Sequence, residues 1–134
     1  MLKAFIVLVF IFLINIPSIY YDWYITWPWF DMVLHFSGGF FMAMFMWHWL
    51  KGYLGKNWFK NIIILSGVVA LVGISWEFLE YFGNQFLVEP IYEAFELRVY
   101  FIGDLNDTLI DLFLDTSGAI IYFILHTLRR RKSH

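Results

Sequence analysis

The chain lacks cysteine altogether, and only 15% of its 134 residues are charged. The absence of cysteine excludes disulfide bonds, thiolate metal sites and cysteine nucleophiles. Basic residues are scarce, and the only cluster of them is the segment 129–132 near the C-terminus. Because a membrane stop signal explains this cluster more simply than an anion-binding patch does, we expect no nucleic-acid partner.

Apolar and aromatic side chains are abundant instead, at 61% and 23% of the residues. A soluble domain of this length could not bury so much apolar surface, whereas lipid can solvate it. Four runs reach the roughly 20 residues that a helix needs to cross the hydrocarbon core, and they cover residues 2–20, 29–50, 61–82 and 107–128. The first run lacks a small-residue cleavage site, so we expect an uncleaved helix. The sequence therefore predicts an all-α, integral membrane four-helix bundle that forms a single domain over residues 1–134.

Lysine and arginine are distributed unevenly around these runs. If the four runs alternate in direction, every basic residue except Arg98 lies on one side, at position 3, between residues 51 and 60, or in the tail 129–132. Cytoplasmic segments carry the excess of lysine and arginine in membrane proteins. We therefore expect both termini in the cytoplasm and the chain in an inner or plasma membrane.

The connection from Gly83 to Gly103 is the longest, and it carries Glu89, Glu93 and Glu96 at helical spacing. Such spacing indicates a short amphipathic helix, which we expect at the membrane interface over the outer mouth of the bundle.

Polar residues line one face of three of the predicted spans. They recur at steps of three or four, which places them on a single helix face. The stripes are Asp31, His35, Gly38, Gly39 and Met42 in the second span, Ser66, Ala70, Gly73, Glu77, Glu80 and Asn84 in the third, and Asp104, Asp107, Asp111, Asp115 and Gly118 in the fourth.

The three stripes also match in depth. At a rise of about 1.5 Å per residue, one set of residues lies roughly 5 Å inside the outer boundary and the next roughly 10 Å inside; the shallower set is Asp31, Glu80 and Asp107, and the deeper set is His35, Glu77 and Asp111. Close carboxylates inside a membrane cannot all be bare anions, so they must share protons, pair with His35 or surround a cation.

A divalent metal ion is the cofactor that these residues suggest, although the sequence leaves open whether one is bound. Oxygen ligands favour Mg²⁺, Ca²⁺ or Mn²⁺, and a histidine also admits Fe²⁺ or Zn²⁺. The candidate ligands are Asp31, His35, Glu77, Glu80, Asp107 and Asp111.

Structural roles compete with this interpretation. Asp104 and Asp107 could cap the fourth helix, and His35 could be no more than a hydrogen-bond partner of a carboxylate. Asp115 lies deeper and could bond a neighbouring helix. Burying a carboxylate within a membrane requires much free energy. For Glu77 and Asp111 this favours a functional role over a structural one.

Three pieces of the sequence resemble a known group. They are Asp31-x-x-x-His35-Phe36-x-x-Gly39-Phe40, Trp76-Glu77-x-x-Glu80, and the run from Gly103-Asp104 through Asp107-Thr108, Asp111 and Asp115 to Gly118-Ala119. Together they resemble the YjdF-type inner-membrane proteins, which are similar to the VanZ-like family. The resemblance implies a small multi-pass protein of the cell envelope and brings no settled enzymatic activity with it.

Three functions follow from these observations. The first is a metal-dependent or acid–base site that acts on a lipid-linked envelope molecule, with Glu77 and Asp111 as cation ligands or general base and His35 as ligand or proton shuttle. The second is a non-enzymatic adaptor or assembly protein, and the third is an ion or proton transporter. Transport is disfavoured because the inner halves of the spans, such as 62–65 and 120–125, are almost wholly apolar. Whether the chain is an enzyme stays open. The expected partners are membrane lipids, and a homo-oligomer is conceivable.

Overall fold

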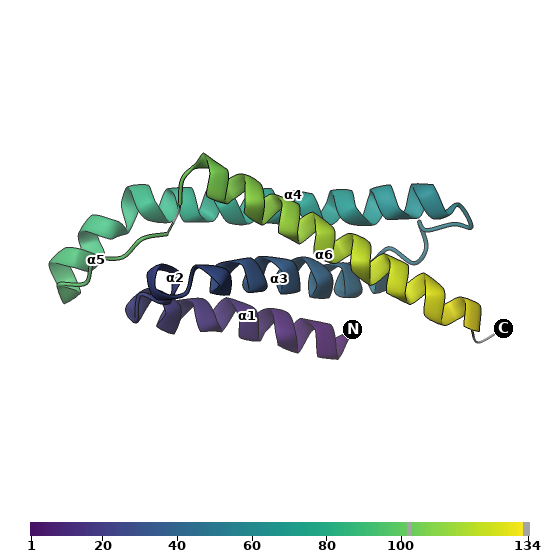
Figure 1. Ribbon diagram of the computed structural model, residues 1–134, viewed down its shortest axis with the longest axis horizontal. Coiled ribbons are helices and arrows are strands. Elements are labelled where there is room, and N and C mark those ends of the chain that lie inside the picture. Colours follow the sequence, from purple (N-terminus) through teal and green to yellow (C-terminus); the bar gives the residue numbers. More distant parts are fainter. Residues whose placement is uncertain (102, 133–134) are drawn as a thin grey trace.

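The computed structural model describes residues 1–101 and 103–132, with side chains up to Arg130, so the last part of the basic tail lies outside the described side chains. These residues form helices and no strands (Figure 1): α1 Leu2–Tyr20, α2 Trp23–Thr26, α3 Pro28–Trp49, α4 Trp58–Phe86, α5 Val88–Phe95 and α6 Leu105–Lys132. By length and composition, α1, α3, α4 and α6 could each cross a membrane. The all-α prediction with four long apolar helices is confirmed for the described residues.

Polar side chains set the helix ends. Asn57 Oδ1 accepts a hydrogen bond from the Lys60 amide at 3.0 Å, so α4 begins at Trp58, earlier than its apolar run suggested. Asp104 Oδ1 accepts from the amides of Asn106 and Asp107 at 2.9 and 3.0 Å. Such caps satisfy amides that have no partner within the helix. The capping role predicted for Asp104 is confirmed.

The helices run back and forth between two ends of the molecule (Figure 1). The end of α6 and the connection between α3 and α4 lie at one end, which we call the terminal end; α1 begins on that side of the middle but short of it, and α2 and α5 lie toward the opposite end. Helix α6 packs against both α3 and α4, whereas α1 packs against α3 and α2. The short helix α5 confirms the helix expected after Gly83. That both termini are cytoplasmic stays a prediction.

Helices α3 and α6 cross with their backbones in close approach. A Cβ atom added at Gly39 would overlap the backbone of Asp115, and one added at Gly118 would overlap the backbone of Phe36 and Phe40. Small residues allow helix backbones to approach in lipid, where van der Waals packing drives association. The two glycines therefore determine how near α3 lies to α6.

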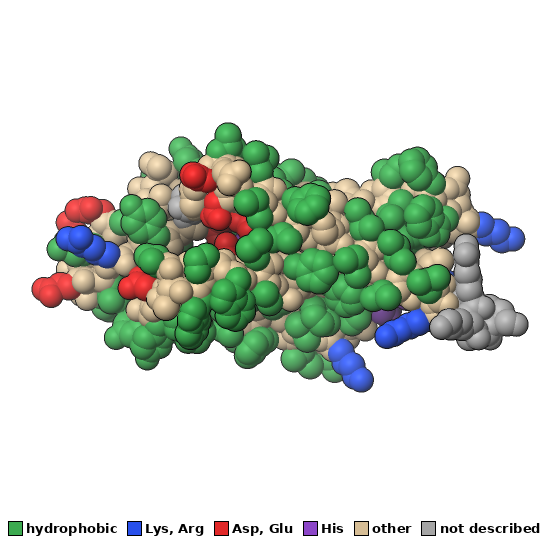
Figure 2. All heavy atoms as spheres, in the orientation of Figure 1, with side chains coloured by type: hydrophobic (Ala, Val, Ile, Leu, Met, Phe, Trp, Pro, Cys, Tyr) green, Lys and Arg blue, Asp and Glu red, His purple; other side chains and the backbone are tan. Residues whose placement is uncertain are grey.

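An apolar core fills the half of the molecule toward the terminal end. Its buried members come from α3, α4 and α6, and they are Ala43, Trp47, Leu65, Val69, Ala119, Tyr122 and Phe123. Charged side chains are separated along the same axis, with acids mainly toward α5 and most lysines and arginines at the terminal end (Figure 2).

We predict that Gly39→Ala destabilises the protein by about 1–3 kcal/mol, because the new methyl group would displace the backbone of α6. Thermal unfolding in mild detergent measures the change. The matched control is Gly67→Ala on α4, where a Cβ meets nothing within 4 Å. Equal unfolding temperatures for the two variants would show that the α3–α6 crossing is not as tight as described.

Candidate functional site

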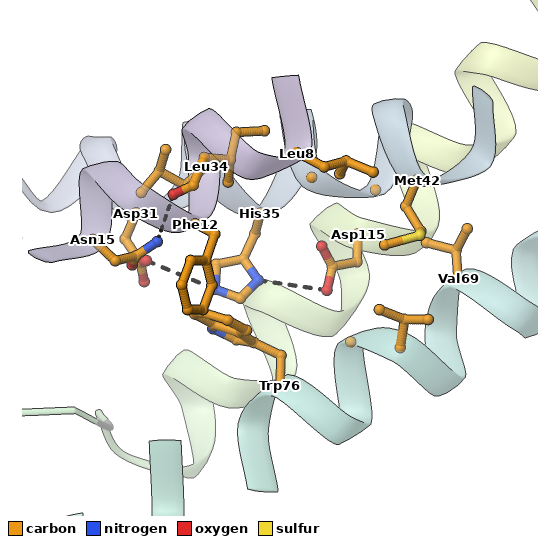
Figure 3. A pocket seen from close by; sticks show the side chains of 15 residues that line it. Leu8, Phe12, Asn15, Asp31, Leu34, His35, Met42, Val69, Trp76 and Asp115 are labelled. Carbon is orange, nitrogen blue, oxygen red and sulfur yellow. Dashed lines mark hydrogen bonds and ion pairs between the residues drawn. The ribbon is translucent and has the colours of Figure 1, made fainter. Parts of the chain in front are cut away.

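His35 on α3 stands among three carboxylates. Its Nε2 lies 3.7 Å from Asp31 Oδ1 and 3.9 Å from Asp111 Oδ2, and its Nδ1 lies 3.5 Å from Asp115 Oδ2. In Figure 3 the ring points toward Asp31 on one side and toward Asp115 on the other. The two ring nitrogens thus face different carboxylates.

The glycine crossing explains why these groups meet. Gly39 touches α6 at Asp115, and His35 precedes Gly39 by one helical turn, so its ring faces the α6 turn between Asp111 and Asp115. Asp31 lies one further turn back on α3 and completes the group. His35, Asp111 and Asp115 are 7%, 3% and 6% exposed, so bulk water does not screen their charges.

Three of these residues have the arrangement of metal ligands. Asp31, His35 and Asp111 each offer one ligand atom, and the three atoms lie within 4.8 Å of one another. Ligand atoms about 2.1 Å from a shared cation lie at most about 4 Å apart. After a small inward movement of the side chains, two carboxylates and one imidazole could hold a metal ion here.

The other predicted ligands are placed differently. Glu80 accepts a hydrogen bond at Oε1 from Trp76 Nε1, 2.9 Å away in the same helix, and Asp107 is exposed in the first turn of α6. Glu77 is 8% exposed, and its buried Oε1 has no hydrogen-bond partner among the described residues. None of the three belongs to the group of ligand atoms around His35, and their role as ligands stays a prediction.

Asp115 is the residue whose importance the sequence understated. Its oxygens face His35 from α6 and also lie against Gly38 on α3 and Gly73 on α4. The contact with a neighbouring helix that was considered for Asp115 is therefore observed, with His35 on α3 as its partner. The available signal was its position one turn after Asp111 on the same stripe.

Two cavities adjoin the His35 group. One, of about 220 Å³, lies between α1, α3, α4 and α6 and has Asp31, His35 and Asp115 in its wall. The other, of about 710 Å³, lies toward α2 and α5 and includes Glu80 and Asp107. Four residues, namely Phe12, Asn15, Asp31 and Trp76, line both cavities. The carboxylate–histidine group therefore borders both cavities, because His35 lines the smaller one and Asp31 lines both.

A family model described as "Predicted membrane protein (DUF2238)" matches residues 2–132, which include all four long helices and every residue of the His35 group. The chain belongs to this family. The description supports a membrane protein and names neither a function nor the YjdF-type or VanZ-like proteins. That resemblance, the cell-envelope role and the particular membrane therefore stay predictions. Comparisons with curated proteins and with solved structures find no match.

Tyr24 on α2 lines the larger cavity. Its hydroxyl donates a hydrogen bond to Asn15 Oδ1 on α1. Burial, followed by the negative charge of Asp31, raises the pKa of Tyr24 well above its ordinary value. The neutral phenol is the form that holds α1 and α2 together at this point.

We expect Tyr24 to make folding stability sensitive to alkaline pH. Because the pKa of Tyr24 is higher in the folded protein, its contribution is complete at neutral pH and is lost as the pH rises above about 10. In Tyr24→Phe, the free energy of unfolding should fall less steeply above that pH. Chemical unfolding in detergent across the alkaline range measures the slope. Tyr53→Phe is the control, because Tyr53 is exposed. Identical slopes for wild type and Tyr24→Phe would contradict the prediction.

Proposed function

We propose that the chain binds a divalent cation through Asp31, His35 and Asp111, and that this centre acts on the headgroup of a lipid-linked cell-envelope molecule. The observation that carries the proposal is the set of three ligand atoms, from α3 and α6, within 4.8 Å of one another. The adjoining cavities supply the space in which a headgroup could meet such a centre.

The balance of charge favours a cation. Asp31, Asp111 and Asp115 surround a single imidazole, so if all three carboxylates are ionised, a protonated His35 would offset only one of their three negative charges. An uncompensated charge in a low-dielectric interior is strongly unfavourable. A divalent cation with a neutral His35 would offset two of the three, and carboxylate oxygens with an imidazole suit Mn²⁺, Fe²⁺ or Zn²⁺.

The orientation of His35 suits a metal ligand. A proton on Nδ1 would be donated to Asp115, which lies 3.5 Å away, and Nε2 would then present its lone pair toward Asp31 and Asp111. Metal-binding histidines are commonly oriented by such a carboxylate on the far nitrogen. Asp115 is thus a positioning residue in this proposal.

The chemistry follows from the small number of ligands. Three protein ligands leave coordination positions for water or for an oxygen of a headgroup, which a cation polarises. Glu77 is the candidate general base, because its buried Oε1 has no partner among the described residues and a base must be free to accept a proton.

Metal content gives the direct test. Wild-type protein purified in mild detergent should carry near-stoichiometric metal by elemental mass spectrometry, after incubation with Mn²⁺ or Zn²⁺ if necessary. Asp31→Asn and Asp111→Asn should lose it, and Asp115→Asn should weaken the affinity by roughly 10–100-fold, because Asp115 orients His35 without itself binding the cation. The control is Glu93→Gln in α5, an exposed acid remote from His35 in the chain.

Folded wild-type protein that takes up none of these ions would refute the metal centre. If the aspartate variants then also unfolded, the carboxylates would be structural and the adaptor function would replace the proposal. If the variants stayed folded, an acid–base site without metal would be the alternative.

Transport is the function that the fold supports least. The apolar core around Trp47, Val69 and Phe123 occupies the half of the bundle beyond the His35 group. We therefore expect liposomes containing the protein to show no proton or Mn²⁺ flux above protein-free liposomes under an imposed gradient. Flux that disappears in Asp111→Asn would contradict a site that is open on one side only.

A further inference from the structure

Helix α1 is attached to one side of the bundle only. It packs along α3 and α2, and among the described residues it makes no close backbone approach to α4 or α6. The rings of Phe12 on α1 and Trp76 on α4 meet edge to face, with centroids 6.1 Å apart. A seam between α1 and α4 is therefore bridged by an aromatic pair.

The 220 Å³ cavity lies in this seam, and its polarity changes along its length. Toward the terminal end its wall carries Leu8, Met42 and Val69, and toward α2 it carries Asn15, Asp31 and His35, with Asp115 between the two groups. Figure 3 shows this order, with Asn15 and Asp31 at one end of the pocket and Met42 and Val69 at the other. The cavity is thus amphipathic along the direction in which the helices run.

We propose that the hydrocarbon chain of a membrane lipid occupies this cavity, that it enters sideways from the bilayer past Phe12, and that its headgroup lies at Asp31 and His35. This names the substrate class of the proposed function, namely an amphiphile bound through its chain, and it rests on that function for the role of the headgroup.

Two observations favour a lipid chain as the occupant. Apart from Asp115, no polar side chain lines the cavity toward the terminal end, so water there would have few partners, and an empty hollow would forfeit van der Waals contacts that a chain would restore. The seam also lies between two helices that could each span a membrane, so hydrocarbon is the solvent that surrounds it.

The two rings at the seam differ in how they are held. Trp76 donates a hydrogen bond from Nε1 to Glu80 Oε1 at 2.9 Å, which anchors the indole to α4. Phe12 has no polar group and is 56% exposed, so its ring is free to rotate into the lipid. Phe12 is therefore the movable side of the opening.

Photo-crosslinking tests the occupant. The protein is reconstituted into phosphatidylethanolamine–phosphatidylglycerol vesicles that contain a phosphatidylglycerol with a diazirine in its acyl chain, and labelled residues are identified by peptide mass spectrometry. In wild type we expect labelling at cavity-lining Ile11 and Met42 in addition to Phe10 and Leu13, which are exposed to lipid. Labelling confined to Phe10 and Leu13 would overturn the proposal.

Matched variants on α4 separate filling of the cavity from general damage. Val72 lines the cavity, whereas its neighbour Leu71 is 63% exposed. Val72→Trp should lower labelling of Ile11 and Met42 several-fold and leave Phe10 unchanged, and Leu71→Trp should change neither. Equal labelling of the cavity in the two variants would overturn the proposal.

Phe12→Ala, at an exposed position, tests the opening. In this variant the probe should label the cavity faster than in wild type, and no change in rate would refute the opening at Phe12.

Metal content separates this inference from the proposed function. Val72→Trp should keep its metal and show cavity labelling that is several-fold lower, whereas Asp111→Asn should lose metal and keep cavity labelling. Wild type with metal and no cavity labelling would overturn the lipid-chain site alone. Wild type with cavity labelling and no metal would overturn the proposed metal centre and leave the chain site supported.

Discussion

The crossing of α3 and α6 at Gly39 and Gly118 is the constraint on which the rest of the structure depends. At both positions a single added carbon would overlap the backbone of the other helix. This contact determines the register of α6 along α3, and the register determines that His35 faces Asp111 and Asp115. A helix pair held apart by ordinary side chains would separate these groups, because none of them is long enough to span a wider gap.

The register also concentrates negative charge around one imidazole. Three carboxylates within 4 Å of His35 cannot all remain anionic in a buried setting unless a cation or protons compensate them. The two ring nitrogens face different carboxylates, because Asp115 lies at Nδ1 whereas Asp31 and Asp111 lie at Nε2. A fixed orientation of this kind is useful in a metal ligand and has less value in a simple hydrogen-bonded core.

Along the bundle the molecule is divided into two unlike halves. Toward the terminal end the residues around Trp47 and Phe123 pack into an apolar core, and toward α2 and α5 the helices separate around cavities of about 220 and 710 Å³. The loose attachment of α1, beside the Phe12–Trp76 pair, belongs to the second half. The proposed centre therefore opens toward one end of the bundle and toward the side.

The sequence by itself determined the helices and their polar faces, because hydrophobic length and periodicity are local properties. It predicted α1 at its observed bounds, and it placed His35 and Asp111 at one depth with Asp31 one turn nearer the outer boundary. It could not decide which acids would meet, since equal depth says nothing about direction around the bundle. In the structure Glu80 accepts a hydrogen bond from Trp76 of its own helix, and Asp107 is exposed. Asp115 instead faces His35. Only the tertiary structure decided these partners, because the backbone contact at Gly39 and Gly118 selects which turn of α6 faces which turn of α3.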